Sequence, residues 1–311
     1  MQRLLTTVTI AGLLVATAAA FAVTERLKLT KSAVYGTRVS YSGRISPTCG
    51  CARGHVTFSL KLRKHDDLTV TVLNAHKDEV ALLASQSFPK GPISFKWNGR
   101  DDLDNRAPDG MYFLRIHLSD AHQTITLPNR IVLDTTAPEI ITVSRNRDQF
   151  SPDGDKQADF VRFAYELSKP ARVILYLGGT KVVGPTYRHP ASGSVSWDGR
   201  VNGTALPAGL YTLELGAVDQ FGNSTPVAER FRLSVQIRYI TIAAHKLTVA
   251  AGHRLVIGVS TDAKRYAWRL GKLKGDSRSH VLNVRAPTRR GRYTLVVEEG
   301  SHLDRAAVFV K

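Results

Sequence analysis

The feature that most constrains this chain is an internal repeat of strand-like segments separated by the same turn residues. The tripeptides at 45–47 and 150–152 both consist of an apolar residue followed by Ser-Pro. The segments that follow them, 56–62 and 161–167, have apolar residues at every second position. This two-residue period is typical of a β-strand with one buried face. Short strands separated by turn signals predict sandwiches of β-sheets rather than packed helices.

The later part of each copy repeats as well. Trp-Asn-Gly-Arg at 97–100 matches Trp-Asp-Gly-Arg at 197–200, and a Pro-x-Gly-x-Tyr pattern occurs at 108–112 and at 207–211. Glycine permits the positive φ that tight turns need, and Trp and Tyr are large enough to fill much of a small core. We predict that four aromatic side chains are largely buried at equivalent places: Trp97, Trp197, Tyr112 and Tyr211.

The N-terminus has the pattern of an export signal. Arg3 is the only charged residue before Glu25, and the residues between them are apolar, small or Thr. The small-x-small tripeptide at 20–22 offers a cleavage site, but the apolar stretch is also just long enough to span a bilayer as a helix. Residues 1–23 are therefore predicted to be a signal peptide or a transmembrane anchor. Either alternative places the rest of the chain outside the cytoplasm, secreted or attached to the membrane.

The predicted fold class is all-β: tandem immunoglobulin-like β-sandwich modules after that N-terminal segment. The first module is expected at 27–137, as a degenerate copy, and the second at 138–237. A proline-ended stretch at 133–138 forms a stiff connector between them. The remainder, 238–311, is expected to be a small basic β-sandwich. Its core would be marginal alone, so packing on the second module is plausible.

The second module resembles the FlgD-type Ig-like domain, which is found in flagellar hook-capping proteins and attached to secreted bacterial proteins, including proteases. The residues that carry the resemblance are FSPDGD at 150–155, WDG at 197–199, PAGLY at 207–211 and DQFGN at 219–223. The first module is a weaker copy of this pattern. The resemblance implies a structural or interaction module without catalysis of its own, but it does not imply hook capping.

One loop could hold a hard cation. Asp153, Asp155 and Asp159 place carboxylates along a glycine-containing loop, which is a ligand pattern suited to Ca²⁺. The twelve-residue EF-hand pattern is absent, and Lys156 brings a positive charge where the family has Gly. The alternative is that these carboxylates cap backbone N–H groups of the loop.

The two cysteines, Cys49 and Cys51, occupy the aligned position in the first module. We expect a local disulfide in an oxidising compartment. A redox-active pair remains an alternative, as does a metal half-site or an intermolecular bond, although no second Cys/His pair stands at a usual metal-binding spacing.

Enzymatic activity is not expected, because no HExxH, GxSxG or glycine-rich phosphate loop occurs and no catalytic-size domain is left over. No cofactor is predicted apart from calcium.

Charge is concentrated in the smallest module. The whole chain carries a formal charge of +17, of which residues 238–311 contribute +10 and residues 138–237 only +1. The alternatives are an ordinary solvated face or a patch for an anionic wall polymer or membrane surface. Export argues against intracellular nucleic acid as a partner. The candidate patch consists of Lys264, Arg265, Arg269, Lys272, Lys274, Arg278, Arg285, Arg289, Arg290 and Arg292.

Three functions follow from these observations. The first is an exported, non-catalytic structural or interaction protein of the cell surface, with an envelope polymer or surface protein as partner. The second is a polyanion-binding protein that acts through its basic C-terminal module. The third, an accessory subunit of a secreted enzyme, rests only on how the family is used elsewhere.

Overall fold

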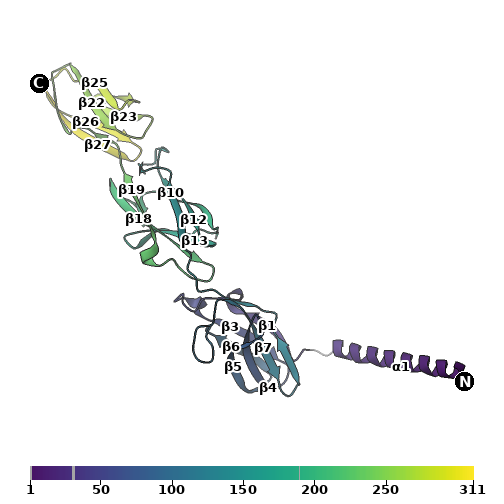
Figure 1. The fold of residues 1–311 in the computed structure, drawn as a ribbon. Coiled ribbons are helices and arrows are strands. Elements are labelled where there is room, and N and C mark those ends of the chain that lie inside the picture. Colours follow the sequence, from purple (N-terminus) through teal and green to yellow (C-terminus); the bar gives the residue numbers. More distant parts are fainter. Residues whose placement is uncertain (1, 30–31, 189) are drawn as a thin grey trace. The chain divides into compact units, whose positions relative to one another are not determined.

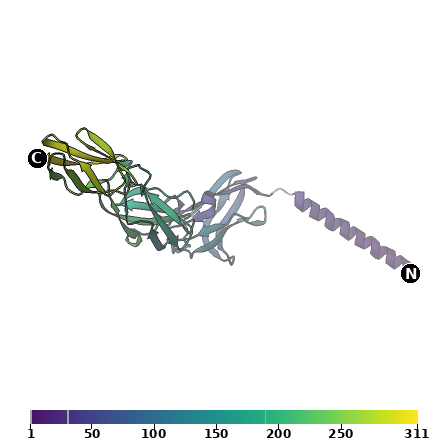
Figure 2. The same ribbon diagram turned by 90° about the horizontal axis from the view of Figure 1, so that it is seen from above.

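The computed structural model describes residues 2–29, 32–188 and 190–311, and within its first helix it describes the side chains of residues 9–22 only. The chain divides into two compact units, Met1–Thr135 and Thr136–Lys311. The first unit contains one α-helix and one β-sandwich, and the second unit contains two sandwiches (Figures 1 and 2).

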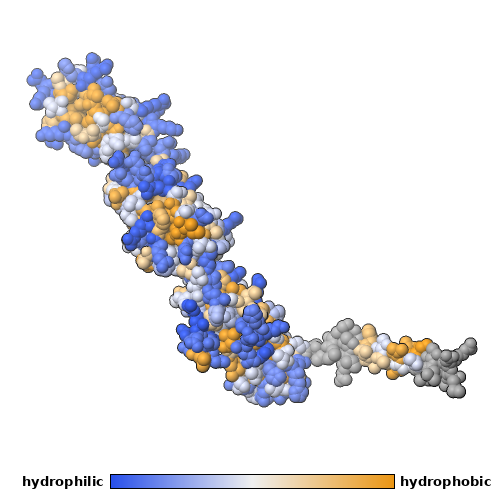
Figure 3. Space-filling view, in the orientation of Figure 1, coloured by the Kyte–Doolittle hydropathy of each residue, from blue (hydrophilic) through white to orange (hydrophobic). Residues whose placement is uncertain are grey.

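The α-helix α1 runs over Gln2–Leu29. Large apolar side chains along it are more than half exposed, and its described part is coloured white to orange on the hydropathy scale of Figure 3. They are Ile10, Leu13, Leu14, Val15 and Phe21. Within the part of the chain that the structure describes, no helix has the apolar length that a bilayer crossing requires.

The first sandwich consists of a three-stranded sheet, β1-β3-β6, facing a larger sheet with the order β2-β9-β7-β4-β5, in which β8 also pairs with β7. Short 3₁₀ turns lie at Ser40–Gly43 and Ala52–Gly54. The strands are β1 (Val34–Val39), β2 (Arg44–Ile45), β3 (Val56–Leu62), β4 (Asp66–Asn74), β5 (Glu79–Phe88), β6 (Gly91–Trp97), β7 (Gly110–Leu118), β8 (Gln123–Thr126) and β9 (Ile131–Leu133).

The second sandwich repeats this arrangement with the sheets β10-β12-β15 and β11-β19-β18-β13-β14, and it adds a small hairpin, β16-β17. A 3₁₀ turn lies at Val227–Glu229. The strands are β10 (Ile140–Arg145), β11 (Gln149–Phe150), β12 (Val161–Leu167), β13 (Ala171–Leu177), β14 (Thr180–Val183), β15 (Ser192–Trp197), β16 (Arg200–Val201), β17 (Thr204–Ala205), β18 (Gly209–Asp219) and β19 (Phe231–Ile237).

The third sandwich has the same plan, with the sheets β20-β22-β25 and β21-β27-β26-β23-β24. In each of the three sandwiches a short early strand pairs in parallel with the last strand: β2 with β9, β11 with β19, and β21 with β27. The strands are β20 (Thr241–Ile242), β21 (Lys246–Val249), β22 (Arg254–Ser260), β23 (Tyr266–Leu270), β24 (Leu273–Ser277), β25 (Val281–Arg285), β26 (Gly291–Glu299) and β27 (His302–Val310).

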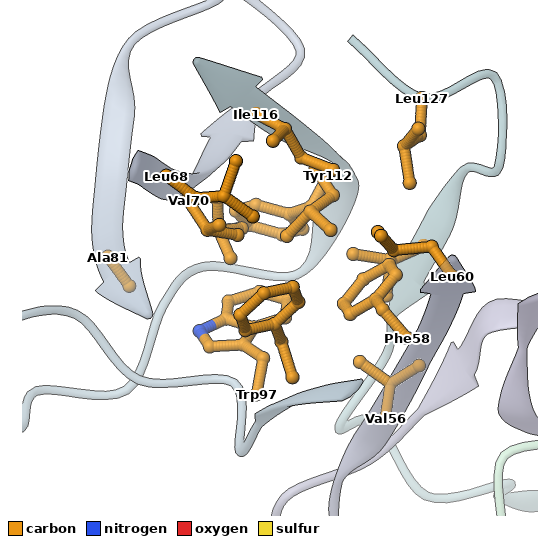
Figure 4. Close-up of a cluster of buried hydrophobic side chains, with 14 of the residues drawn as sticks. Val56, Phe58, Leu60, Leu68, Val70, Ala81, Trp97, Tyr112, Ile116 and Leu127 are labelled. Carbon is orange, nitrogen blue, oxygen red and sulfur yellow. The ribbon is translucent and has the colours of Figure 1, made fainter. Parts of the chain in front are cut away.

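Each sandwich has its own hydrophobic core between its two sheets. In the first, Figure 4 shows Trp97 beside Phe58 and Tyr112, and all three are at most 3% exposed. The alternation of the strands accounts for this, since β3 buries every second residue from Val56 to Leu62. The predicted all-β, immunoglobulin-like sandwich fold is therefore confirmed.

The repeated aromatic residues occupy equivalent places in their sandwiches. The indole N–H of Trp97 donates to the Arg100 carbonyl at 2.8 Å, and that of Trp197 donates to the Arg200 carbonyl at 3.0 Å. Each indole thus closes the turn that follows its own strand, and its polar atom is satisfied inside the core.

The tyrosines of the Pro-x-Gly-x-Tyr pattern also share one role. The Tyr112 hydroxyl donates to the Pro108 carbonyl, and the Tyr211 hydroxyl donates to the Pro207 carbonyl. Tyr293 makes the same contact with the Arg289 carbonyl in the third sandwich. This hydrogen bond fixes the turn that leads into each long strand.

Tyr211 packs against the second core but is less completely buried than Tyr112, which is 3% exposed. Tyr112 packs against Trp97 with ring centroids 4.8 Å apart, whereas Tyr211 lies 6.3 Å from Trp197. The greater separation of the two rings accompanies the lesser burial of Tyr211.

Candidate functional site

The candidate site is a cluster of carboxylates at the loop that joins β11 to β12. The Ser151 N–H donates to the Ala158 carbonyl at 3.1 Å, which closes the loop into a compact turn. Asp159 stabilises it from within, because its two carboxylate oxygens accept hydrogen bonds from the N–H groups of Gly154, at 2.7 Å, and Lys156, at 2.8 Å. Asp159 therefore has the capping role that the sequence left open as an alternative.

The structure brings Asp153 and Asp155 together with Glu299 rather than with Asp159. One carboxylate oxygen from each of these three residues lies within 4.8 Å of the other two. Glu299 is the last residue of β26, so two of the carboxylates come from the second sandwich and one from the third. Glu299 could not be assigned to this cluster from the sequence, because it lies in another module and no local motif marks it.

Backbone contacts hold the two sandwiches together at this point. The Ser301 N–H donates to the Asp153 carbonyl at 2.8 Å. The preceding residue, Gly300, has a φ of +52°, and a Cβ atom placed on it would lie 2.4 Å from that same carbonyl oxygen. Only glycine allows this approach without a shift of the backbone.

An aromatic contact lies close to the same junction. The rings of Tyr239 and His302 are stacked, with centroids 3.5 Å apart and an angle of 5° between their planes. The Tyr239 hydroxyl donates to the Leu206 carbonyl of the second sandwich at 2.6 Å. Tyr239 thus connects the segment between the sandwiches to both of them.

Two of the three carboxylates are deeply buried, since Asp153 and Glu299 are each 4% exposed. Burial raises the pKa of Asp153 to about 6, and the carboxylates of Asp155 and Asp262 add to this rise. Burial likewise raises the pKa of Glu299 to about 7, and the charge of Asp153 acts in the same direction. The cluster gathers negative charge where water cannot screen it well.

Only some of the buried carboxylate oxygens in this cluster accept hydrogen bonds. The Ser151 hydroxyl donates to Oδ2 of Asp153 at 3.1 Å, and the Thr261 hydroxyl donates to Oε2 of Glu299. Oε1 of Glu299 is buried without a hydrogen-bond partner. A small cavity of about 100 Å³ adjoins these residues and is lined in part by Ser151, Thr261 and Asp262.

The cysteines of the first sandwich form the expected local disulfide. Cys49 and Cys51 are joined with their Cα atoms 5.2 Å apart, in the loop between β2 and β3. No free cysteine is found in the described chain. The bond ties the loop that follows the first Ser-Pro repeat.

The basic residues of the third sandwich are distributed over both of its sheets. Arg269 and Lys274 are cross-strand neighbours on β23 and β24, while Arg285 lies on β25 in the smaller sheet. Arg265 is paired with Asp276 at 2.5 Å. The other predicted members are exposed, in turns or on β26: Lys264, Lys272, Arg278, Arg289, Arg290 and Arg292.

Beside Arg269 and Lys274 lies a groove of about 450 Å³ over strands β23, β24 and β26. Its lining also includes Asp276 and Glu298, so the groove carries both signs of charge. The ten basic residues thus do not form one continuous patch, and the groove on the larger sheet combines two cations with two carboxylates.

A comparison with known families matches residues 45–121 to the FlgD Ig-like domain. The match falls in the first sandwich, which the sequence analysis considered the weaker copy. The shared strand order and the equivalent Trp and Tyr contacts of the first two sandwiches explain why the pattern can be traced in both. No curated protein sequence matches the chain.

Several solved structures are similar to this chain. The ectodomain of mouse nectin-like molecule 4 is 15% identical, with 83% of this chain and 95% of that chain covered and a TM-score of 0.27. FlgD from P. aeruginosa is 17% identical, with 45% and 89% covered and a TM-score of 0.24. The D0-D1 domain of intimin is 11% identical, with 66% and 98% covered and a TM-score of 0.25. Similarity at this level supports no conclusion about function.

Proposed function

We propose that this chain, in which residues 45–121 match the FlgD Ig-like domain, is an exported, non-catalytic protein that acts as a structural or interaction module at a cell surface. The interiors of its sandwiches are filled by their own side chains. Recognition therefore falls to exposed loops and strand edges, which is where folds of this class carry their binding residues.

The observation that carries the export proposal is the apolar, exposed helix α1. Five large apolar side chains that face solvent along one helix suit a signal or membrane-associated segment, because they gain no burial within a sandwich. The disulfide between Cys49 and Cys51 supports the same proposal, since such bonds persist mainly in oxidising compartments.

Cell fractionation with mass determination of the mature N-terminus tests this proposal. Cleavage after Ala22 predicts a chain that begins at Val23 and is recovered outside the cytoplasmic fraction. An intact chain in the membrane fraction would identify the segment as an anchor. An intact chain with reduced cysteines in the cytoplasm would contradict export.

A second candidate function is binding of an anionic polymer or an anionic membrane through the third sandwich, and the specific observation in its favour is the pair of adjacent cations Arg269 and Lys274. Charge reversal of both residues in the full chain should weaken retention on anionic vesicles, because each basic residue near such a surface contributes about 1 kcal/mol. Retention of the unaltered chain should fall as salt is raised, since salt screens these contacts.

A matched control is charge reversal of Lys61 and Lys96, which are exposed on the first sandwich. This variant should be retained as strongly as the unaltered chain. Equal loss of retention in both variants would mean that only net charge matters, and salt-independent retention would rule out an electrostatic contact.

A further inference from the structure

We propose that Asp153, Asp155 and Glu299 bind one Ca²⁺ ion between the second and third sandwiches, so that the ion joins the two. This site differs from the loop site suggested by sequence, because one of its ligands comes from the other sandwich and Asp159 is not a ligand. The inference goes beyond the proposed function and does not depend on export.

The spacing of the three carboxylates suits one shared ion. Ca²⁺ binds oxygen ligands at about 2.3–2.6 Å, so two ligands of the same ion lie at most about 5 Å apart. The three oxygens are all within 4.8 Å of one another. Small movements of the side chains would therefore let a single cation contact one oxygen from each residue.

An independent observation points to a missing ligand. The side chain of Glu299 is 4% exposed, and its Oε1 atom has no hydrogen-bond partner although it belongs to this cluster. A buried carboxylate oxygen without a partner is costly, because it has lost its water and gained nothing in exchange. A bound cation supplies that partner.

The charge balance favours the same conclusion. Asp262 lies near the three carboxylates and adds to the repulsion among them, and its hydrogen bond with Glu299 requires a proton on one of the two carboxyl groups. Among the residues that the structure describes, the ion pairs found do not include Asp153, Asp155 or Glu299. Buried charges of one sign are stable only when they are neutralised by protons or by a cation.

The ligand chemistry selects a hard ion. All three donors are carboxylates, with no His or Cys among them, which favours Ca²⁺ or Mg²⁺ over zinc. Ca²⁺ accepts irregular sets of six to eight oxygens, whereas Mg²⁺ requires a nearly ideal octahedron at about 2.0–2.1 Å. Three carboxylates on two separate elements form an irregular set of ligands, which fits Ca²⁺ better.

Such an ion would stiffen the junction that the backbone already forms. The ligands Asp153 and Glu299 lie directly beside the hydrogen bond from the Ser301 N–H to the Asp153 carbonyl. An ion held from both sides resists separation of the sandwiches, so its binding free energy adds to the stability of their contact.

The test is a calcium titration of the full chain after treatment with EDTA. Calorimetry should detect one Ca²⁺ per chain, and 10 mM Ca²⁺ should raise the melting temperature of the second unit by about 4 °C or more. Glu299→Gln should weaken Ca²⁺ binding at least tenfold. Without calcium this variant should melt above the unaltered chain, because the substitution removes a buried charge.

Two matched variants make the result decisive. Glu298→Gln changes the neighbouring exposed carboxylate, and Asp159→Asn changes the loop cap; both should keep the calcium response. Absence of a calcium effect on the unaltered chain, or a full calcium effect in Glu299→Gln, would overturn the proposal. An equal response to Mg²⁺ would overturn the assignment of the ion, and loss of the response in Asp159→Asn alone would place the ion in the loop.

Discussion

Trp197→Ala should unfold the second sandwich at temperatures where the unaltered protein is folded. The Trp197 side chain is 1% exposed, and removal of a buried Trp costs about 3–5 kcal/mol through lost apolar burial and the cavity left behind. The variant also loses the hydrogen bond from the indole to the Arg200 carbonyl. A typical domain has a free energy of unfolding of about 5–15 kcal/mol, so this substitution removes a large part of the stability of the sandwich. Scanning calorimetry of the full chain should show the transition of the second sandwich more than 10 °C lower.

Trp97→Ala serves as the comparison in the first unit. Trp97 is 2% exposed and makes the same contact with the Arg100 carbonyl, so its loss should lower the transition of the first sandwich by a similar amount. Because the two residues belong to separate cores, each substitution should leave the transition of the other unit in place. A Trp197→Ala variant that shifts the transition of the first unit equally would contradict independent cores.

Gly300→Ala should weaken the junction between the second and third sandwiches by about 2–3 kcal/mol. About 1–2 kcal/mol comes from forcing a residue with a Cβ atom into the left-handed region, and about 1 kcal/mol from the lost hydrogen bond between Ser301 and Asp153. The new Cβ atom would overlap the Asp153 carbonyl oxygen, so the sandwiches must separate or distort. The second and third sandwiches should then melt in two resolved transitions.

Gly252→Ala is the control for this prediction. Gly252 lies in the same sandwich with a φ of +71°, but a Cβ atom there would meet only the Thr288 side chain at 3.7 Å. This variant carries the backbone cost alone and should leave the junction intact. If both variants behave alike in calorimetry, the close approach of Gly300 to Asp153 has no energetic role.

The sequence predicted the fold well because the forces that determine it are local and periodic. The alternation in 56–62 and 161–167 determines which face of each strand is buried, and the Trp-x-Gly turns place Trp97 and Trp197 in their cores. The lesser burial of Tyr211, compared with Tyr112, was not predictable in the same way. This burial depends on how closely the neighbouring Trp ring packs. The distance between the ring centroids of Trp and Tyr is 4.8 Å in the first sandwich and 6.3 Å in the second, although the two sequences are similar.

The acidic cluster was only half predictable, for a physical reason. Asp153 and Asp155 belong to one loop, and their proximity follows from their spacing. Glu299 reaches them because β26 ends at the junction, where Gly300 lets the chain approach the loop of the other sandwich. Contacts between modules form only when two folded surfaces pack against each other. No local sequence motif indicates which residues will meet there.

Labelling of living cells tests directly whether the chain is exported. Intact cells that express the full chain, together with their medium, are treated with a membrane-impermeant, amine-reactive reagent. Exposed lysines such as Lys61, Lys96 and Lys272 are available for the reaction in the folded protein. We expect the chain to be labelled in the intact cells and their medium to the same extent as in a lysate, while a cytoplasmic protein in the same cells is not labelled. Labelling only after lysis would show that the chain stays in the cytoplasm and would contradict export.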